Sequence, residues 1–176
     1  MEDSSFGEKR NAFIKIIQSI FTNNDSETIT LTKVKITDMM RAITDYCAND
    51  KYLYKNHKRS QQTYRYSKSA WIIKDTPKNA GLVGDHCVPL NCIFEYLADA
   101  NKKTPLSADE IRKFLDYHLE IVMITKDEDN KLNGLKLKSK MPMNWEWFGE
   151  KYLRYKNADI EIEEASMKNN LSVRTL

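Results

Sequence analysis

The sequence predicts a helix-rich α+β fold in a single domain, with a small β-hairpin or short sheet. Two observations predict it: long segments repeat apolar residues at helical spacing, whereas only short runs alternate or are β-branched like strands. The chain has 176 residues, which is close to the roughly 150 residues of one domain. No linker-like composition divides it, so we expect one globular domain over residues 1–164 and a polar C-terminal tail over residues 165–176.

The N-terminal part contains several candidate helices. Apolar residues at helical spacing predict a helix over residues 8–21. Residues 28–37 alternate polar and apolar side chains, which fits either a strand or the lead-in to a helix. Thr37 or Asp38 could cap a helix that continues to about Cys47, and a further helix is expected over residues 61–73.

Residues 90–125 carry clearer signals of secondary structure. Residues 90–100 have helical periodicity. Ser107 and Glu110 match a capping box, which predicts a helix over residues 108–119. The apolar, β-branched run over residues 120–125 is short enough to predict a buried strand.

The remaining segments are short. A short helix is expected after the buried strand, with Gly134 as its C-cap. Aromatic residues at helical spacing predict a helix over residues 145–155, and the alternation of Ile160 and Ile162 indicates a final short strand. His118 lies near the end of a predicted helix, where a positive charge would interact favourably with the helix dipole.

The composition excludes several classes of protein. A hydrophobic share of 41% and a charged share of 30% are typical of a globular protein, not of a disordered chain or a disulfide scaffold. No apolar run approaches the roughly 20 residues that cross a bilayer, so no membrane partner is expected. Three cysteines without CxxC spacing fit a reducing compartment, and the polar N-terminus lacks a signal-peptide core. We therefore expect a cytoplasmic protein.

Positive charge is concentrated between residues 51 and 78, where eight basic residues accompany one acid and five aromatic residues. Cations displace counterions from phosphates and aromatic rings stack on bases, so this segment predicts a nucleic-acid surface, with DNA favoured over RNA. The alternative is a solvated basic face whose rings point into the core. The residues expected to bind nucleic acid are Lys55, Lys58, Arg59, Tyr64, Arg65, Lys68 and Trp71.

The segment GLVGDHCVPLN carries the motif that suggests chemistry. Asp85, His86 and Pro89 form a D-H-x-x-P pattern, with two glycines before it and a predicted helix after it. This pattern resembles the HNH, or ββα-metal, nucleases, in which an Asp-His or Glu-His pair ends the first strand of a hairpin. The later strand and helix, IVMITKDEDNKL, are similar to the closing element of that motif. The resemblance implies a ββα-metal-like element within the fold.

The resemblance also implies roles for individual residues. In that family the histidine is the general base that activates water, and the adjacent acid helps to hold one divalent metal ion. His86 is therefore expected to be catalytic and Asp85 to bind Mg²⁺ or Mn²⁺. Asp129 or Asn130 stands where the family often has its last histidine or asparagine, so both are candidate metal ligands, and Asn91 is a candidate for the middle asparagine. A histidine pKa of about 6.5 suits a base near neutral pH, and Mg²⁺ needs few protein ligands.

Three functions remain open on these observations. The first is a metal-dependent endonuclease that hydrolyses phosphodiesters, in a prokaryotic restriction or defence system. The second is a non-catalytic nucleic-acid-binding subunit or regulator, in which Asp85 caps a turn and a backbone carbonyl satisfies His86. The third is a protein-interaction module, such as an inhibitor or immunity protein, whose basic segment meets an acidic partner. The chain could act as a homodimer or as a subunit of a larger complex.

Overall fold

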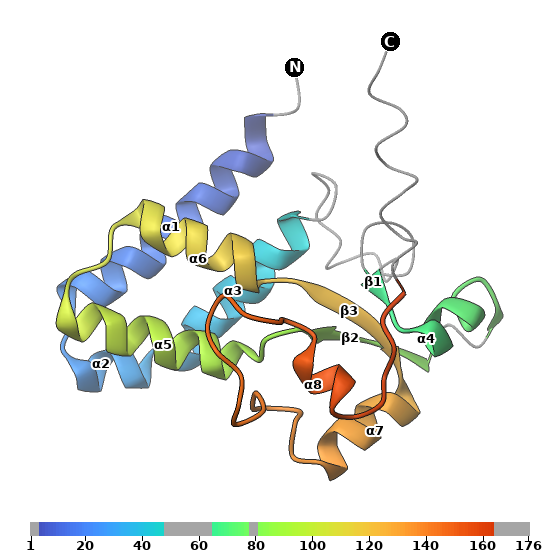
Figure 1. Ribbon diagram of the computed structural model, residues 1–176. Helices are drawn as coiled ribbons and strands as arrows, with labels where there is room; N and C mark the ends of the chain where they lie inside the picture. Colours follow the sequence, from blue (N-terminus) through green and yellow to red (C-terminus); the bar gives the residue numbers. More distant parts are fainter. Residues whose placement is uncertain (1–3, 48–64, 78–80, 164–176) are drawn as a thin grey trace.

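The structure, a computed structural model, describes residues 4–47, 65–77 and 81–163 and has a helix-rich α+β fold (Figure 1). Among these residues none of the helices is long and apolar enough to span a membrane. The helices are α1 (Ser4–Asn23), α2 (Ser26–Leu31), α3 (Lys33–Cys47), α4 (Lys68–Ile73), α5 (Leu90–Lys103), α6 (Ala108–His118), α7 (Lys126–Gly134) and α8 (Leu153–Lys156). The strands are β1 (Arg65–Tyr66), β2 (Leu82–His86) and β3 (Ile121–Thr125).

The three strands form one mixed sheet in the order β1-β3-β2. β2 and β3 are antiparallel, and their pairing sets Asp85 opposite Val122 and His86 opposite Ile121. The connection between these two strands contains α5 and α6, and α7 follows β3 directly. β1 runs parallel to β3 at the other edge of the sheet.

The central strand β3 is covered on both faces, which explains its unbroken apolar sequence. Val122 and Ile124 pack with Leu132 of α7 and Tyr155 of α8. The alternate residues of β3 point the other way and pack against β1 and α4. A larger apolar core unites α1, α2, α3, α5 and α6, which Figure 1 shows gathered beside the sheet.

Several elements were predicted correctly from their local signals. The helix expected over residues 8–21 is α1, and the one expected over residues 90–100 is α5. Ser107 and Glu110 make both hydrogen bonds of the predicted capping box at the start of α6. The buried strand is β3, and Thr125 after it begins a second capping box that opens α7.

Two predictions for the N-terminal half need correction. Residues 28–37 are not a strand: residues 28–31 end α2, Thr32 is its C-cap and residues 33–37 begin α3, so the helical alternative holds. The Asp25 side chain accepts the Thr28 N–H and starts α2. α3 therefore begins before Thr37. The helix expected over residues 61–73 begins only at Lys68, where Ser67 is the N-cap, and the two residues before Ser67 pair with β3. Residues 61–64 lie outside the described ranges.

The helix predicted over residues 145–155 was also wrong. This segment forms successive turns, and only α8 is helical. Phe148 has a left-handed φ of 63°, which a continuous α-helix does not accommodate. The final strand expected at Ile160 and Ile162 is reduced to a single bridge between Ser67 and Ile162.

The C-terminus of α7 also differs from the prediction, because Gly134 is the last helical residue and not the residue that turns the chain. The turn is made by Lys136, whose φ is 59°. The Leu137 N–H reaches back to the Leu132 carbonyl at 2.8 Å, as in a Schellman-type helix end. Lys136 thus adopts a left-handed conformation that glycine would adopt with less strain.

Replacing Lys136 by glycine should therefore stabilise the protein. The left-handed conformation costs a side chain about 1–2 kcal/mol, and the added backbone entropy of glycine offsets about 0.5–1 kcal/mol of the gain. We expect Lys136→Gly to raise the free energy of unfolding in urea by about 0.5–1 kcal/mol. Lys140→Gly is the control, since Lys140 is not among the residues with positive φ. An equal gain from both variants would contradict the assignment.

His118 is buried and neutral, and it does not act as a cationic partner of the helix dipole. Its Nδ1–H donates to the Phe114 carbonyl at 2.9 Å, so Nε2 accepts the Phe148 N–H at 3.5 Å. Burial lowers the pKa of His118, and the charge of Lys151 lowers it further. The loop around Phe148 thus packs on an imidazole that is held in its neutral form.

The stability of the protein should fall as His118 becomes protonated. Its folded pKa lies below the unfolded value of 6.5, so the unfolded chain binds the extra proton first. The stabilisation is complete above pH 6.5 and is lost as the pH falls below that value, at up to about 1.4 kcal/mol per pH unit. Urea unfolding of wild type and His118→Gln at pH 7.5 and 5.5 measures it. Equal losses in the two proteins would show that another group titrates.

Candidate functional site

The end of β2 opens into a polar cavity of about 270 Å³. Asp85 and His86 both line it. Neighbouring residues of a strand normally face opposite sides, and the two side chains contact different elements: Asp85 contacts Arg154 and Tyr155, and His86 contacts Thr44 of α3. The N-terminus of α5 lies at the wall of the cavity, where helical N–H groups contribute partial positive charge. The lining residues are Arg41, Gly84, Asp85, His86, Pro89, Leu90, Asn91, Lys138 and Ser139.

Asp85 is held in place by two residues of the α8 region. Arg154 forms an ion pair with its Oδ2, and the Tyr155 hydroxyl donates to the same oxygen at 2.6 Å. Burial raises the pKa of the Asp85 carboxyl, and Arg154 and Tyr155 oppose that rise. Arg154 supplies the buried counter-charge of this carboxyl group. Both contacts involve Oδ2.

Arg154 is the residue at this site that no sequence pattern singled out. Its side chain is 0% exposed, which is exceptional for a charged residue. It donates to the carbonyl oxygens of Cys87 at 2.9 Å and Leu137 at 2.8 Å, and also to that of His86. One guanidinium therefore joins the end of β2 to the loop that carries Lys138. In the sequence, Arg154 stands out only as a charged residue within the aromatic segment, residues 145–155.

Removal of Arg154 should strongly destabilise the protein. Arg154→Met leaves the Asp85 carboxylate buried without its counter-charge, which typically costs about 3–5 kcal/mol. The double variant Arg154→Met/Asp85→Leu should recover part of this loss, because both charges are gone. Urea unfolding measures the three free energies. Fully additive losses in the double variant would contradict the pairing.

His86 is oriented by α3. Its Nε2 lies 3.2 Å from Thr44 Oγ1, and the Thr44 hydroxyl donates its hydrogen to the Met40 carbonyl at 2.9 Å. Because a hydroxyl has one hydrogen, Thr44 Oγ1 accepts from His86, and Nε2 carries the proton of the neutral ring. Nδ1 is then the proton acceptor of the ring. His86 is half-buried and faces polar groups, as a general base requires.

The two other predicted metal ligands do not join Asp85 in the cavity wall. Asp129 is 3% exposed and forms ion pairs with Lys138 at 2.9 Å and Lys126 at 3.5 Å. Asn130 is the next residue of α7 and is exposed. In the described part of the chain, no three His, Cys, Asp or Glu side chains are grouped as a metal site.

A sparse set of oxygen donors does line the cavity. Asp85 contributes a carboxylate, and Asn91, at the start of α5, contributes a side-chain amide. Mg²⁺ and Mn²⁺ prefer such oxygen ligands, and Mg²⁺ commonly keeps several waters beside one or two carboxylates. Asp85 and Asn91 are the residues of the cavity lining that carry carboxylate or amide oxygens, whereas Asp129 is already paired with two lysines.

Cys87, which follows His86, is not a candidate nucleophile. Its thiol is 0% exposed, and burial raises the pKa of the thiol well above its ordinary value. A buried, protonated thiol neither attacks a substrate nor binds zinc readily. Asp85 and His86 therefore remain the candidate residues at the end of β2.

The predicted nucleic-acid residues that the structure describes lie at the β1 edge of the sheet, away from the cavity. Arg65 pairs with Glu120 at 3.0 Å, and Lys68 pairs with Glu161. Trp71 packs edge-on against Tyr66, with ring centroids 5.6 Å apart. Lys55, Lys58, Arg59 and Tyr64 lie outside the described ranges.

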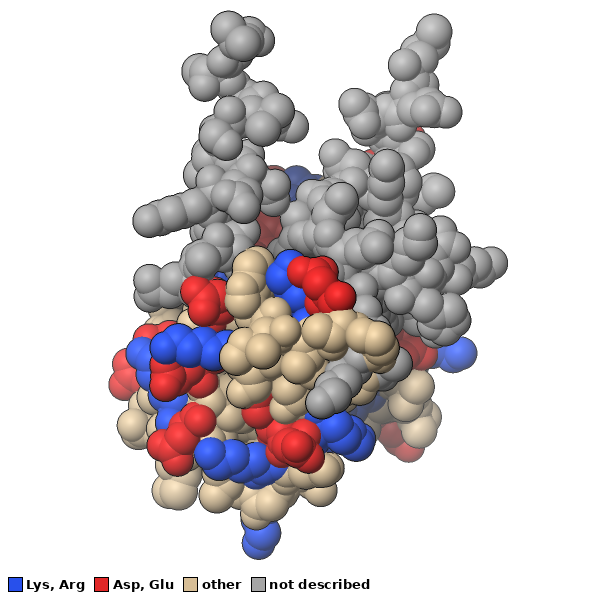
Figure 2. Space-filling model, turned by 90° about the vertical axis from the view of Figure 1, so that its right-hand side faces the viewer, with Lys and Arg blue, Asp and Glu red and all other residues tan. Residues whose placement is uncertain are grey.

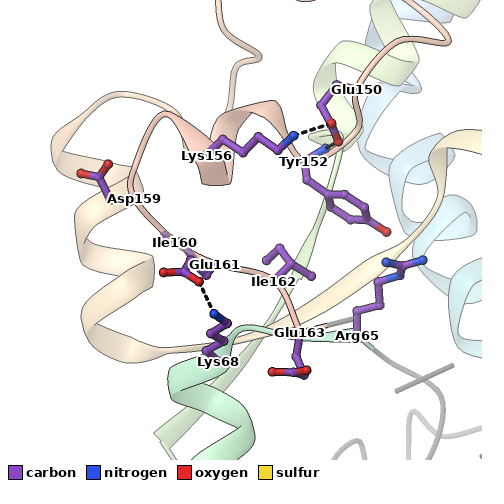
Figure 3. A pocket seen from close by; sticks show the side chains of 10 residues that line it. All are labelled: Arg65, Lys68, Glu150, Tyr152, Lys156, Asp159, Ile160, Glu161, Ile162 and Glu163. Atoms are coloured by element: carbon purple, nitrogen blue, oxygen red, sulfur yellow. Dashed lines mark hydrogen bonds and ion pairs between the residues drawn. The ribbon is translucent and has the colours of Figure 1, made fainter. Parts of the chain in front are cut away.

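Arg65 and Lys68 line a second pocket, with a volume of about 760 Å³ (Figure 3). Acidic residues surround them there, and the Lys68–Glu161 and Lys156–Glu150 ion pairs lie on its walls. Figure 2 shows Lys and Arg interspersed with Asp and Glu over the described part of the face it presents. The charge balance of this pocket does not favour a phosphate.

Comparisons with protein-family models, curated proteins and solved structures give no match for this chain.

Proposed function

We propose that the protein is a nucleic-acid endonuclease that hydrolyses phosphodiester bonds with His86 as general base. The observation that carries this proposal is the cavity at the end of β2, which His86 shares with Asp85, Asn91 and two basic side chains. A histidine oriented by a hydroxyl group, an anchored carboxylate and nearby positive charge are the groups that water activation at a phosphate requires.

The order of elements around the cavity also supports an HNH-like enzyme. β2 and β3 form an antiparallel pair, and α7 packs against both strands, which is a ββα arrangement. The Asp-His pair ends the first of these strands, as in the family that the motif resembles. The departure is the connection between the strands, which holds two full helices, α5 and α6.

In the proposed reaction, His86 Nδ1 accepts a proton from the water that attacks the phosphorus. The P–O bond to one sugar oxygen breaks, and a solvent water protonates that leaving oxygen. Thr44 holds Nε2–H and so keeps the lone pair on Nδ1. Asp85 and Asn91 would hold a divalent ion, which stabilises negative charge on the phosphate oxygens when bound. Arg154 fixes the Asp85 carboxylate, and basic side chains of the cavity attract the phosphodiester.

A second candidate is a nucleic-acid-binding subunit without catalysis. Its support is that cations of the chain already balance both buried acids: Arg154 pairs with Asp85, and Lys138 pairs with Asp129. In that case the same cavity would bind a phosphate, with no ion and no hydrolysis. The two candidates differ in whether DNA is cleaved.

Cleavage of supercoiled plasmid with Mg²⁺ or Mn²⁺ tests the proposal. His86→Ala should lower the rate about 10²- to 10⁴-fold, because a general base contributes that factor. Binding to a DNA duplex and the melting temperature should change little. His57→Ala is the matched control, since it removes a histidine of the basic segment, and it should retain cleavage at saturating DNA.

Chelation with EDTA should stop cleavage by the wild-type protein. Cleavage by His86→Ala at the wild-type rate would remove His86 from the mechanism. Salt-sensitive DNA binding without any nicking, for wild type in either metal, would contradict the enzyme and establish the binding subunit. Parallel assays with RNA would decide which nucleic acid is cleaved.

A further inference from the structure

Lys138 is one of the two basic residues that line the cavity beside His86. Its side chain is half-exposed and lies beside Asp129, with Nζ 2.9 Å from a carboxylate oxygen. The carbonyl oxygens of Lys138 and its neighbour Leu137 both accept hydrogen bonds from Arg154. The backbone and the side chain of this lysine are therefore both fixed, although it follows a helix in an irregular loop.

The Asp129 side chain is more deeply buried than the carboxylate of an ordinary surface ion pair. Its side chain is 4% exposed, whereas that of Lys138 is 50% exposed. A buried carboxylate normally has to be compensated, and here two lysines supply the positive charge. The ion pair with Asp129 therefore fixes the Lys138 ammonium group, while half of the lysine side chain remains exposed to solvent.

Arg41 contributes a second cation to the cavity from a different element, α3. Its contact with Asp38, three residues earlier, is between two side chains that are more than half exposed, so it is weak and easily exchanged for another anion. The cavity, about 270 Å³, is smaller than most pockets for drug-sized ligands. Its size suits a phosphate with part of a sugar.

We propose that Lys138 and Arg41 bind a phosphate of the nucleic-acid backbone beside His86, and that Asp129 is the positioning residue that holds Lys138 for this contact. The identity of the ligand rests on the proposed function, whereas the site itself requires no hydrolysis. Asp129, which the motif suggested as a metal ligand, thus has a different role: it orients a lysine.

Fluorescence anisotropy with a labelled 20-base-pair DNA duplex in EDTA tests the phosphate contacts without cleavage. The affinity is measured between 50 and 200 mM KCl. Each phosphate contact contributes about 0.9 to the slope of log K against log salt. Lys138→Ala and Arg41→Ala should each reduce the magnitude of that slope by about 0.9, and Lys138→Arg should restore it.

Lys140→Ala is the matched control, because Lys140 is exposed on the same loop and does not line the cavity. It should leave the slope within about 0.3 of wild type, well below the effect of one contact. Equal effects of Lys138→Ala and Lys140→Ala would overturn the phosphate site in favour of a diffuse charge effect. Melting temperatures confirm that each variant is folded.

The role of Asp129 is tested by a double-mutant cycle. If Asp129 positions Lys138, the fold-loss of affinity caused by Lys138→Ala should be clearly smaller in an Asp129→Asn background than in wild type. Equal fold-losses in both backgrounds would show that Lys138 binds without help from Asp129. Asparagine keeps the size of the buried side chain, so α7 should remain folded.

The result is independent of the nuclease assay. If Lys138→Ala and Arg41→Ala reduce the salt slope of DNA binding but the wild-type protein never cleaves DNA, the phosphate site is supported and only the hydrolysis is contradicted. Cleavage that depends on His86, combined with unchanged slopes, would contradict only the phosphate site.

Discussion

The central constraint of this structure is the complete burial of one charged side chain, that of Arg154. Arg154 is 0% exposed, and desolvation of its guanidinium is tolerated only because Asp85 and four backbone carbonyls surround it. These partners come from the end of β2 and from the loop after α7. The interaction therefore brings together segments far apart in the sequence, and the cavity walls form where they meet.

The elements that could be predicted from the sequence are those whose signal is local. α1 and α5 follow from apolar periodicity, and α6 follows from Ser107 and Glu110. Residues 145–155 were mispredicted because long-range contacts determine their path. Phe148 packs on His118 and takes a left-handed φ, which helical spacing of aromatic residues cannot reveal.

The candidate site was predictable to the same limited extent. The D-H-x-x-P pattern located Asp85 and His86, and the structure places both on one cavity. Arg154 could not be selected, since a lone arginine looks the same in sequence whatever it contacts. Lys138 belongs to a short basic run with Lys136 and Lys140, but nothing in that run distinguishes it from the other two. The charge excess of residues 51–78 was equally ambiguous, because Glu120 and Glu161, which partner Arg65 and Lys68, lie far along the chain.

The insertion of α5 and α6 between β2 and β3 has a consequence for the order of folding. The pairing of His86 with Ile121 closes a long loop, which costs entropy before it yields any sheet contact. Helices that pack through neighbouring residues form sooner than such distant strand pairs. α5 and α6 contact each other and also α1, so the long connection is itself part of the larger apolar core. Formation of that core shortens the effective loop that the pairing of β2 with β3 has to close.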